Sequence, residues 1–134
     1  LLESGDIYKV MYDNTMLNMY PGNYFDGSLY NIYLKVGEKY TKLIGIDSPS
    51  TFAYKGNQIF YKGSFNNVKY MVVITIYNDI WFCDVDVKSE TDDEITIYYG
   101  FDVGLANEGI NEAYNCQYID HNVLKEGERM KGAH

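Results

Sequence analysis

The fold is decided by the stretch Gln58-Ile-Phe-Tyr-Lys-Gly-Ser-Phe-Asn-Asn-Val-Lys-Tyr-Met-Val-Val-Ile-Thr-Ile-Tyr-Asn-Asp-Ile-Trp-Phe-Cys-Asp-Val-Asp-Val-Lys88. Apolar residues recur in it at every second position, which is the period of a half-buried β-strand. Strands are predicted at Gln58 to Phe65, Val68 to Ile76 and Ile80 to Lys88. Asn66-Asn67 joins the first two strands, and Asn tolerates the left-handed backbone of a type I′ turn. The stretch therefore predicts antiparallel strands joined by tight turns.

The same alternation continues on both sides of this stretch and predicts further strands. One face of Leu29 to Val36 carries Tyr30, Ile32, Leu34 and Val36, and Gly37-Glu38-Lys39 is a compact turn that leads to a partner strand. We expect strands at Asp6 to Tyr12, Leu29 to Val36, Tyr40 to Ile44 and Glu94 to Phe101, with turns at Tyr77 to Asp79 and Ser89 to Asp93. The last three strands of the chain, Val68 to Ile76, Ile80 to Lys88 and Glu94 to Phe101, should be consecutive neighbours in one sheet.

Trp81 stands in an apolar row with Cys83, Val85 and Val87, while Phe82, Asp84, Asp86 and Lys88 occupy the other face of that strand. Since a strand alternates its faces, Trp81 should be buried with its row. The sequence as a whole predicts an all-β domain, an antiparallel β-sandwich, over residues 1–124.

Size and charge restrict the classes of partner. A chain of 134 residues is long enough for one domain with a core. Its net charge of −8 repels nucleic acid and anionic lipid, so we expect neither nucleic-acid nor membrane partners. The first residues lack the pattern of a signal peptide, and Cys83 and Cys116 do not make a disulfide framework. These features favour a cytoplasmic protein with free thiols.

Fifteen tyrosines are the unusual part of the composition. A large ring with a polar tip suits a half-buried sheet face, so most of them read as sheet filler. The rest are open to a second interpretation, as platforms on which sugar rings stack.

The run from Asp102 to His121 departs from the alternating pattern, and it resembles a known family. Its Asp-x-Gly-Leu, followed by Asn-Glu-Ala-Tyr-Asn-x-Gln-Tyr-Ile-Asp-His, is similar to a stretch in the N-terminal β-sandwich of the inverting glycoside phosphorylases of glycoside hydrolase family 94. That family includes cellobiose phosphorylase and 1,2-β-oligoglucan phosphorylase. Weaker similarity extends through Gly5 to Tyr12, Met16 to Tyr20 and Tyr70 to Phe101.

The resemblance implies a supersandwich of the galactose mutarotase-like kind in a longer cytosolic enzyme. In that family a separate (α/α)6 barrel carries the catalytic acid and the phosphate site, and the enzyme is a glycosyltransferase that uses inorganic phosphate. The implied function is a carbohydrate-associated, non-catalytic domain of an enzyme of β-glucan metabolism. The implied partners are a β-glucan oligosaccharide or the barrel, in a homodimer. The family's sandwiches are about twice this length, so this chain resembles a fragment or a shortened relative.

A polar and aromatic cluster carries most of the resemblance. It consists of Glu112, Tyr114, Gln117, Tyr118, Asp120 and His121. The spacing of Ile110, Ala113, Tyr114, Gln117 and Tyr118 predicts a short helix or irregular segment from Asn107 to about His121. Two interpretations stay open for the cluster, namely contact with sugar or the barrel, and internal bracing of an irregular crossover.

Other constellations are weaker. Asp84 and Asp86 project from one strand face at about 7 Å, a separation within reach of a glycosidase acid and base pair. With Lys88 on the same face they are more typical of a solvated strand surface. Asp120-His121 could be half of a catalytic dyad, but no Ser or Cys stands in a recognisable nucleophile motif. Cys116 is better explained as a structural thiol. The zinc ligand spacing and the phosphate-loop glycine spacing are both missing, so no metal and no cofactor are expected. We expect no catalytic residues in this chain and no enzyme activity from it alone.

Two predictions concern the ends of the fold. Lys125 to His134 is charged, lacks an apolar period and should be a mobile tail. A shortened sandwich leaves an apolar face or a sheet edge uncovered, and dimerisation is a simple way to cover it. If sugar is not bound, the alternative function is a structural or protein-interaction β-sandwich module.

Overall fold

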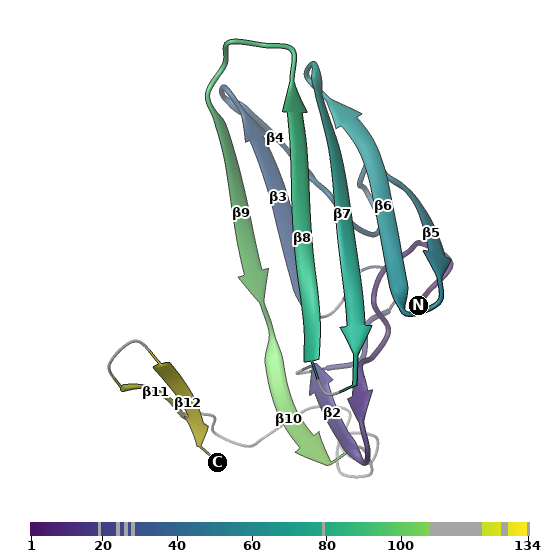
Figure 1. Ribbon diagram of the computed structural model, residues 1–134, viewed down its shortest axis with the longest axis vertical. Coiled ribbons are helices and arrows are strands. Elements are labelled where there is room, and N and C mark those ends of the chain that lie inside the picture. The colour runs from purple at the N-terminus through teal and green to yellow at the C-terminus, as the bar shows by residue number, and fades with distance from the viewer. Residues whose placement is uncertain are drawn as a thin grey trace.

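The computed structural model describes residues 1–18, 20–23, 25, 27, 29–78, 80–107, 122–126 and 129–133. Regular secondary structure in these residues is entirely β-strand, and every pairing is antiparallel, which confirms the all-β, antiparallel prediction (Figure 1). No helix in this part of the chain is long and apolar enough to cross a membrane. The helix or irregular segment expected up to His121 lies, from residue 108 onward, outside the described residues. The strands are β1 (Met11–Tyr12), β2 (Thr15–Asn18), β3 (Tyr30–Val36), β4 (Lys39–Lys42), β5 (Thr51–Lys55), β6 (Gln58–Phe65), β7 (Val68–Tyr77), β8 (Ile80–Ser89), β9 (Ile95–Phe101), β10 (Val103–Asn107), β11 (Asn122–Glu126) and β12 (Arg129–Ala133).

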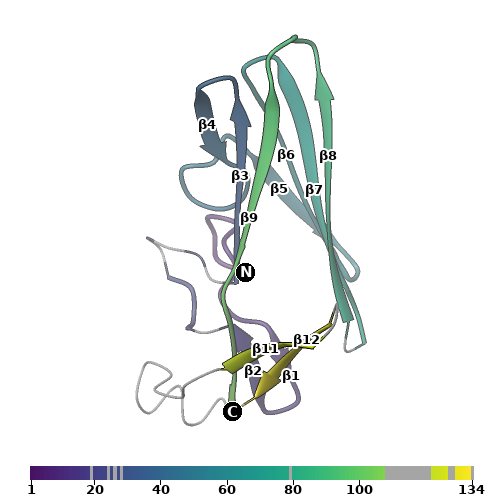
Figure 2. The same ribbon diagram turned by 90° about the vertical axis from the view of Figure 1, so that its left-hand side faces the viewer.

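Two sheets form the body of the sandwich. A four-stranded sheet has the order β5-β6-β7-β8, and a three-stranded sheet has the order β4-β3-β9. Figure 2 shows them as two layers that face each other, and the core lies between them. The core takes alternate residues of β3 from one layer and of β6 and β7 from the other, because strand side chains alternate faces. These residues are Tyr30, Ile32, Leu34, Val36, Tyr61, Val68, Tyr70, Val72 and Ile74.

Local turn chemistry explains the hairpins. Asn66 and Asn67 have φ angles of 46° and 61°, so both adopt the left-handed conformation that the predicted type I′ turn requires. Gly37, with φ of 57°, makes the turn between β3 and β4 in the same way. The predicted β6–β7, β7–β8 and β3–β4 hairpins are confirmed.

The prediction that the last three strands form one sheet is wrong. β9 pairs with β3 in the opposite layer, with Tyr30 opposite Phe101 and Val36 opposite Ile95. The segment between β8 and β9 therefore crosses from one layer to the other. Because of this crossing, the apolar row of β9 faces the core between the two sheets. Had β9 extended the β5-β6-β7-β8 sheet instead, its apolar row would have needed a further element to bury it.

The first predicted strand is also mostly wrong, because only Met11–Tyr12 of Asp6 to Tyr12 is a strand. Backbone groups that precede β1 form hydrogen bonds with a side chain and with a loop residue, and they do not form the ladder of a regular strand. The Val10 N–H donates to Asn18 Oδ1 at 2.8 Å, and the Gly22 N–H donates to the Tyr8 carbonyl. Five strands were not predicted from the sequence, namely β2, β5, β10, β11 and β12.

The chain after residue 121 contains a small hairpin. β11 and β12 pair with each other, with Asn122 opposite Ala133. The segment from Lys125 onward therefore includes strand, where the sequence lacks an apolar period. Its mobility stays a prediction, and so does the boundary at residue 124.

Candidate functional site

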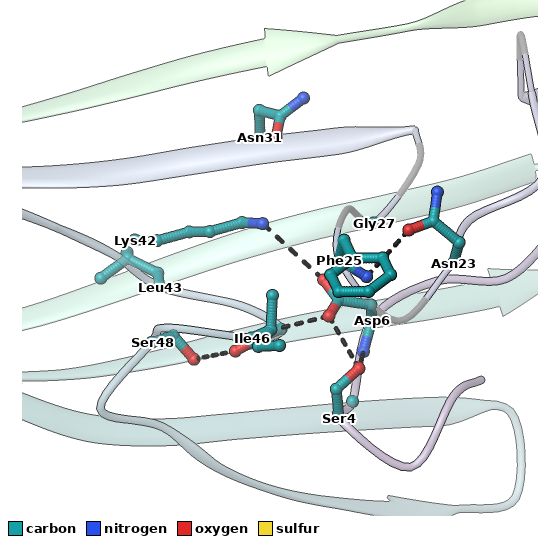
Figure 3. Close-up of polar contacts among 12 residues, drawn as sticks. Ser4, Asp6, Asn23, Phe25, Gly27, Asn31, Lys42, Leu43, Ile46 and Ser48 are labelled. Carbon is teal, nitrogen blue, oxygen red and sulfur yellow. Dashed lines mark hydrogen bonds and ion pairs between the residues drawn. The ribbon is translucent and has the colours of Figure 1, made fainter.

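One side of the sandwich is closed by a buried carboxylate. The side chain of Asp6 is 2% exposed, and its Oδ2 accepts hydrogen bonds from Ser4 Oγ and from the Ile46 N–H, both at 2.7 Å (Figure 3). Lys42 Nζ lies 3.7 Å from Oδ1 and is itself 13% exposed. This network ties the N-terminal segment to β4 and to the turn that follows it. Because both oxygens of Asp6 are engaged inside the protein, the group serves as a brace.

The surrounding glycines leave room for this carboxylate. Gly45 has φ of 76°, and a Cβ there would overlap Asp6 Oδ1, as would a Cβ on Gly27. The Tyr61 hydroxyl donates at 2.7 Å to the Gly5 carbonyl and extends the brace into the core. Burial, then the charge of Asp6, raises the pKa of Tyr61 above its usual range.

The opposite side of the sandwich is open in the part of the chain that the structure describes. β8 and β9 are the last strands of their sheets among the described residues, and no described strand pairs with their outer edges. Their inward-facing rows are only partly covered, with Val87 37%, Ile97 37%, Tyr99 51% and Phe101 40% exposed. We call this surface, formed by the inward rows of β8 and β9, the open edge. It is continuous with the core, because Trp81, Cys83, Val85 and Ile95 pack against the buried residues.

Aromatic rings line the open edge at the end where β8 begins and β9 finishes. The ring centroids of Trp81 and Phe101 are 6.0 Å apart, and those of Tyr30 and Phe101 are 5.3 Å apart. An apolar cavity of about 150 Å³ lies beside them, lined in part by Tyr30, Ile74 and Trp81. Trp81 faces the core as its row predicts, but it is half-buried rather than buried, because β8 is an edge strand.

The ionisable groups of this region have raised pKa values. Burial, followed by the neighbouring Tyr99 hydroxyl, raises the pKa of Tyr30 well above its usual range. Cys83 is a free thiol, and burial, followed by the charge of Asp84, raises its pKa to about 11. Such a thiol is protonated at neutral pH and is a poor nucleophile. The open edge is therefore apolar, and Tyr30 and Cys83 stay protonated there at neutral pH. Such a surface suits contact with protein better than catalysis.

The cluster predicted from the sequence belongs to another part of the chain. Glu112, Tyr114, Gln117, Tyr118, Asp120 and His121 all lie outside the described residues. Their role stays a prediction.

The weaker sequence candidates fall on the surface. Asp84 and Asp86 are exposed on the outer face of β8, as the interpretation as a solvated surface expects. Within the described ranges, no three His, Cys, Asp or Glu side chains converge on a metal site.

The burial of Asp6 was missed at the level of sequence, and the open edge was anticipated only as an uncovered face or edge. Nothing marks Asp6 as buried, since its partners Lys42 and Ile46 are distant along the chain. The open edge did leave a signal. From Ile95 to Phe101 the sequence Ile-Thr-Ile-Tyr-Tyr-Gly-Phe has no charged residue, which is unusual for a strand whose edge is free.

Comparison with known proteins corrects the assignment suggested by the run from Asp102 to His121. A family model described as the SOGP N-terminal domain matches residues 1–131, and no curated protein matches the chain. The model that matches is not that of a glycoside hydrolase family 94 N-terminal domain. The resemblance was specific over only about twenty residues, whereas the family model extends over nearly the whole chain.

The functions inferred from that resemblance are corrected with it. They were a domain of a glycoside phosphorylase and carbohydrate binding, and the matched family does not indicate either. The match covers far more than half of the sequence, and the chain therefore belongs to the SOGP N-terminal domain family.

Proposed function

We propose that this domain is a non-catalytic β-sandwich module that acts through protein–protein contact, and that the open edge is its contact surface. The observation that carries the proposal is the partial exposure of inward-facing apolar residues on β8 and β9, among them Tyr99 at 51% and Phe101 at 40%. Apolar surface continuous with a core is costly to leave in water, at about 25 cal/mol per Å². Covering it by another protein surface removes that cost.

The two sides of the sandwich support the same proposal by their difference. The Asp6 side is closed by the brace of hydrogen bonds and the Lys42 ion pair. The β8–β9 side has no comparable closure among the described residues, and its aromatic rings remain accessible. An apolar, uncharged surface at a sheet edge is typical of a protein interface.

Site-specific photo-cross-linking in cells that make the protein tests this function. A benzoylphenylalanine placed at Tyr99 should give a covalent adduct with a protein, identified by mass spectrometry. The matched control is the same group at Tyr40, an aromatic residue on β4 that is 71% exposed and therefore more accessible than Tyr99. Adducts at 40 but none at 99 would show that the open edge is not the contact surface.

A further inference from the structure

The backbone of β9 points half of its hydrogen-bonding groups away from its sheet. Two bonds fix which half, because the Gly37 N–H donates to the Glu94 carbonyl and the Asp102 N–H donates to the Leu29 carbonyl, each at 3.0 Å. In an antiparallel ladder, such bonded pairs alternate with non-bonded pairs. The even-numbered residues of β9 therefore bond to β3. The N–H and C=O groups of Ile95, Ile97, Tyr99 and Phe101 point to the free edge.

The side chains of β9 place no charge on that edge. The strand has seven residues, none of them charged and none of them proline, so it lacks the usual devices that prevent edge pairing. Ile97 and Tyr99, whose backbone groups point outward, are 37% and 51% exposed. This strand can accept an added strand through its backbone without burying a charge.

The other free edge is protected by its charges. On β8, Asp84 and Asp86 face outward. A second β8 paired antiparallel about Asp84, Val85 or Asp86 would set carboxylates opposite one another, which is destabilising. Of the two edges that border the opening, β9 is therefore the one suited to pair with a copy of itself.

The acidic residues beside β9 restrict the register. Pairing centred on Tyr98 would set Glu94 opposite Asp102 of the other copy, which is a like-charge contact. Pairing centred on Ile97 sets Ile95 opposite Tyr99 and Glu94 opposite Gly100, so no carboxylates oppose each other between residues 94 and 100. The nearest like-charge pair is then Asp92 and Asp102, and Asp92 lies in the crossing before β9. This register also places an aromatic residue against a β-branched one, which is a favourable cross-strand pair.

We propose that β9 pairs antiparallel with β9 of a second copy of this chain, centred on Ile97, so that the two β4-β3-β9 sheets become one continuous sheet. This inference rests on the proposed function, since it names the occupant of the open edge. The interface is isologous, and the inward rows of the two β9 strands cover each other laterally. Because each copy carries a net charge of −8, added salt should strengthen the association.

Amide hydrogen exchange measured residue by residue tests the pairing in the unmodified chain. Above the dissociation constant found by sedimentation equilibrium, the amides of Ile97 and Tyr99 should be protected. Below it they should exchange freely, while those of Thr96 and Tyr98 stay protected by β3 at both concentrations. Protection of Ile97 and Tyr99 that does not change with concentration, or a chain that is monomeric throughout, would overturn the pairing.

Ile97→Pro provides a second test, because proline removes an N–H that points only to the free edge. It should raise the dissociation constant at least about tenfold, whereas Ile97→Val, which keeps the N–H, should change it by less than about threefold. An unchanged dissociation constant in folded Ile97→Pro would contradict the proposal.

The cross-linking experiment separates this inference from the proposed function. An adduct at Tyr99 with another copy of the chain supports both. An adduct with a different protein keeps the proposed function and overturns the self-pairing. The absence of any adduct at Tyr99 removes the proposed function as well.

Discussion

Trp81 shows how far a single residue's environment follows from strand alternation. Its indole lies on the core side of β8 and packs against Phe101, with ring centroids 6.0 Å apart and an angle of 24° between the ring planes. Alternation therefore gives the correct face. Its position at a sheet edge leaves it half-buried, and that position depends on pairings that the sequence does not reveal.

Trp81→Ala should lower the free energy of unfolding by about 2–3 kcal/mol, less than the about 3–5 kcal/mol of a fully buried tryptophan. The matched control is Phe82→Ala, since Phe82 is the next residue, lies on the outer face and is 52% exposed. It should cost at most about 1 kcal/mol. Urea denaturation followed by circular dichroism measures both. A larger loss for Phe82→Ala would mean that the two faces of β8 are assigned the wrong way round.

At the scale of elements, the turn between β6 and β7 depends on two left-handed asparagines. Asn67→Ala should lower stability by about 1 kcal/mol, because an alanine pays the steric cost of a positive φ. Asn67→Gly should leave stability unchanged or raise it, since glycine adopts this conformation freely. Thermal denaturation of the two variants decides the matter. Equal losses for both would point to a role of the Asn67 side chain instead of its backbone.

The elements that the sequence predicts are those whose signals are local. The Asn66-Asn67 turn and the alternating row of β3 are each contained in a few neighbouring residues. β9 was predicted as a strand but assigned to the wrong sheet, because its partner is chosen by the fit between layers and not by its own residues. β2 has a short apolar signal and pairs with the distant β10.

The candidate site was less predictable than the fold. The expected cluster at 112–121 lies outside the described residues, and the open edge depends on which strands end each sheet. The uncharged sequence of β9 is the one local signal of its position. The prediction of an uncovered apolar face or sheet edge came from the length of the chain relative to the sandwiches of the resembled family, and the homodimer that it suggested remains part of the proposal above.

At the scale of the whole molecule, buried acids should make the fold sensitive to alkali. Burial raises the pKa of Cys83 from 9.0 to about 11, and it also raises the pKa of Tyr30, Tyr61 and Tyr70. Above about pH 9 the unfolded chain releases these protons while the folded chain keeps them. Stability from these groups is therefore complete below about pH 9 and is lost as the pH rises toward the folded values.

Urea midpoints measured across this pH range should stay level up to about pH 9 and then fall. Tyr61→Phe is the informative variant. It should be less stable than the unmodified chain at neutral pH, by about 1 kcal/mol, because the Gly5 carbonyl loses its donor. It should also show a shallower alkaline loss. An unmodified chain whose midpoint stays level to pH 11 would contradict the role of these buried groups.

The pairing of β9 with β3 also affects how the chain folds while the ribosome is still making it. Translation delivers β3 early, yet the strand that completes its second edge, with Phe101 opposite Tyr30, is delivered after the whole β5-β6-β7-β8 sheet. The apolar row of β3 therefore emerges well before its last cover. During that interval the nascent chain offers a chaperone, or another emerging copy, the surface that the finished sandwich buries.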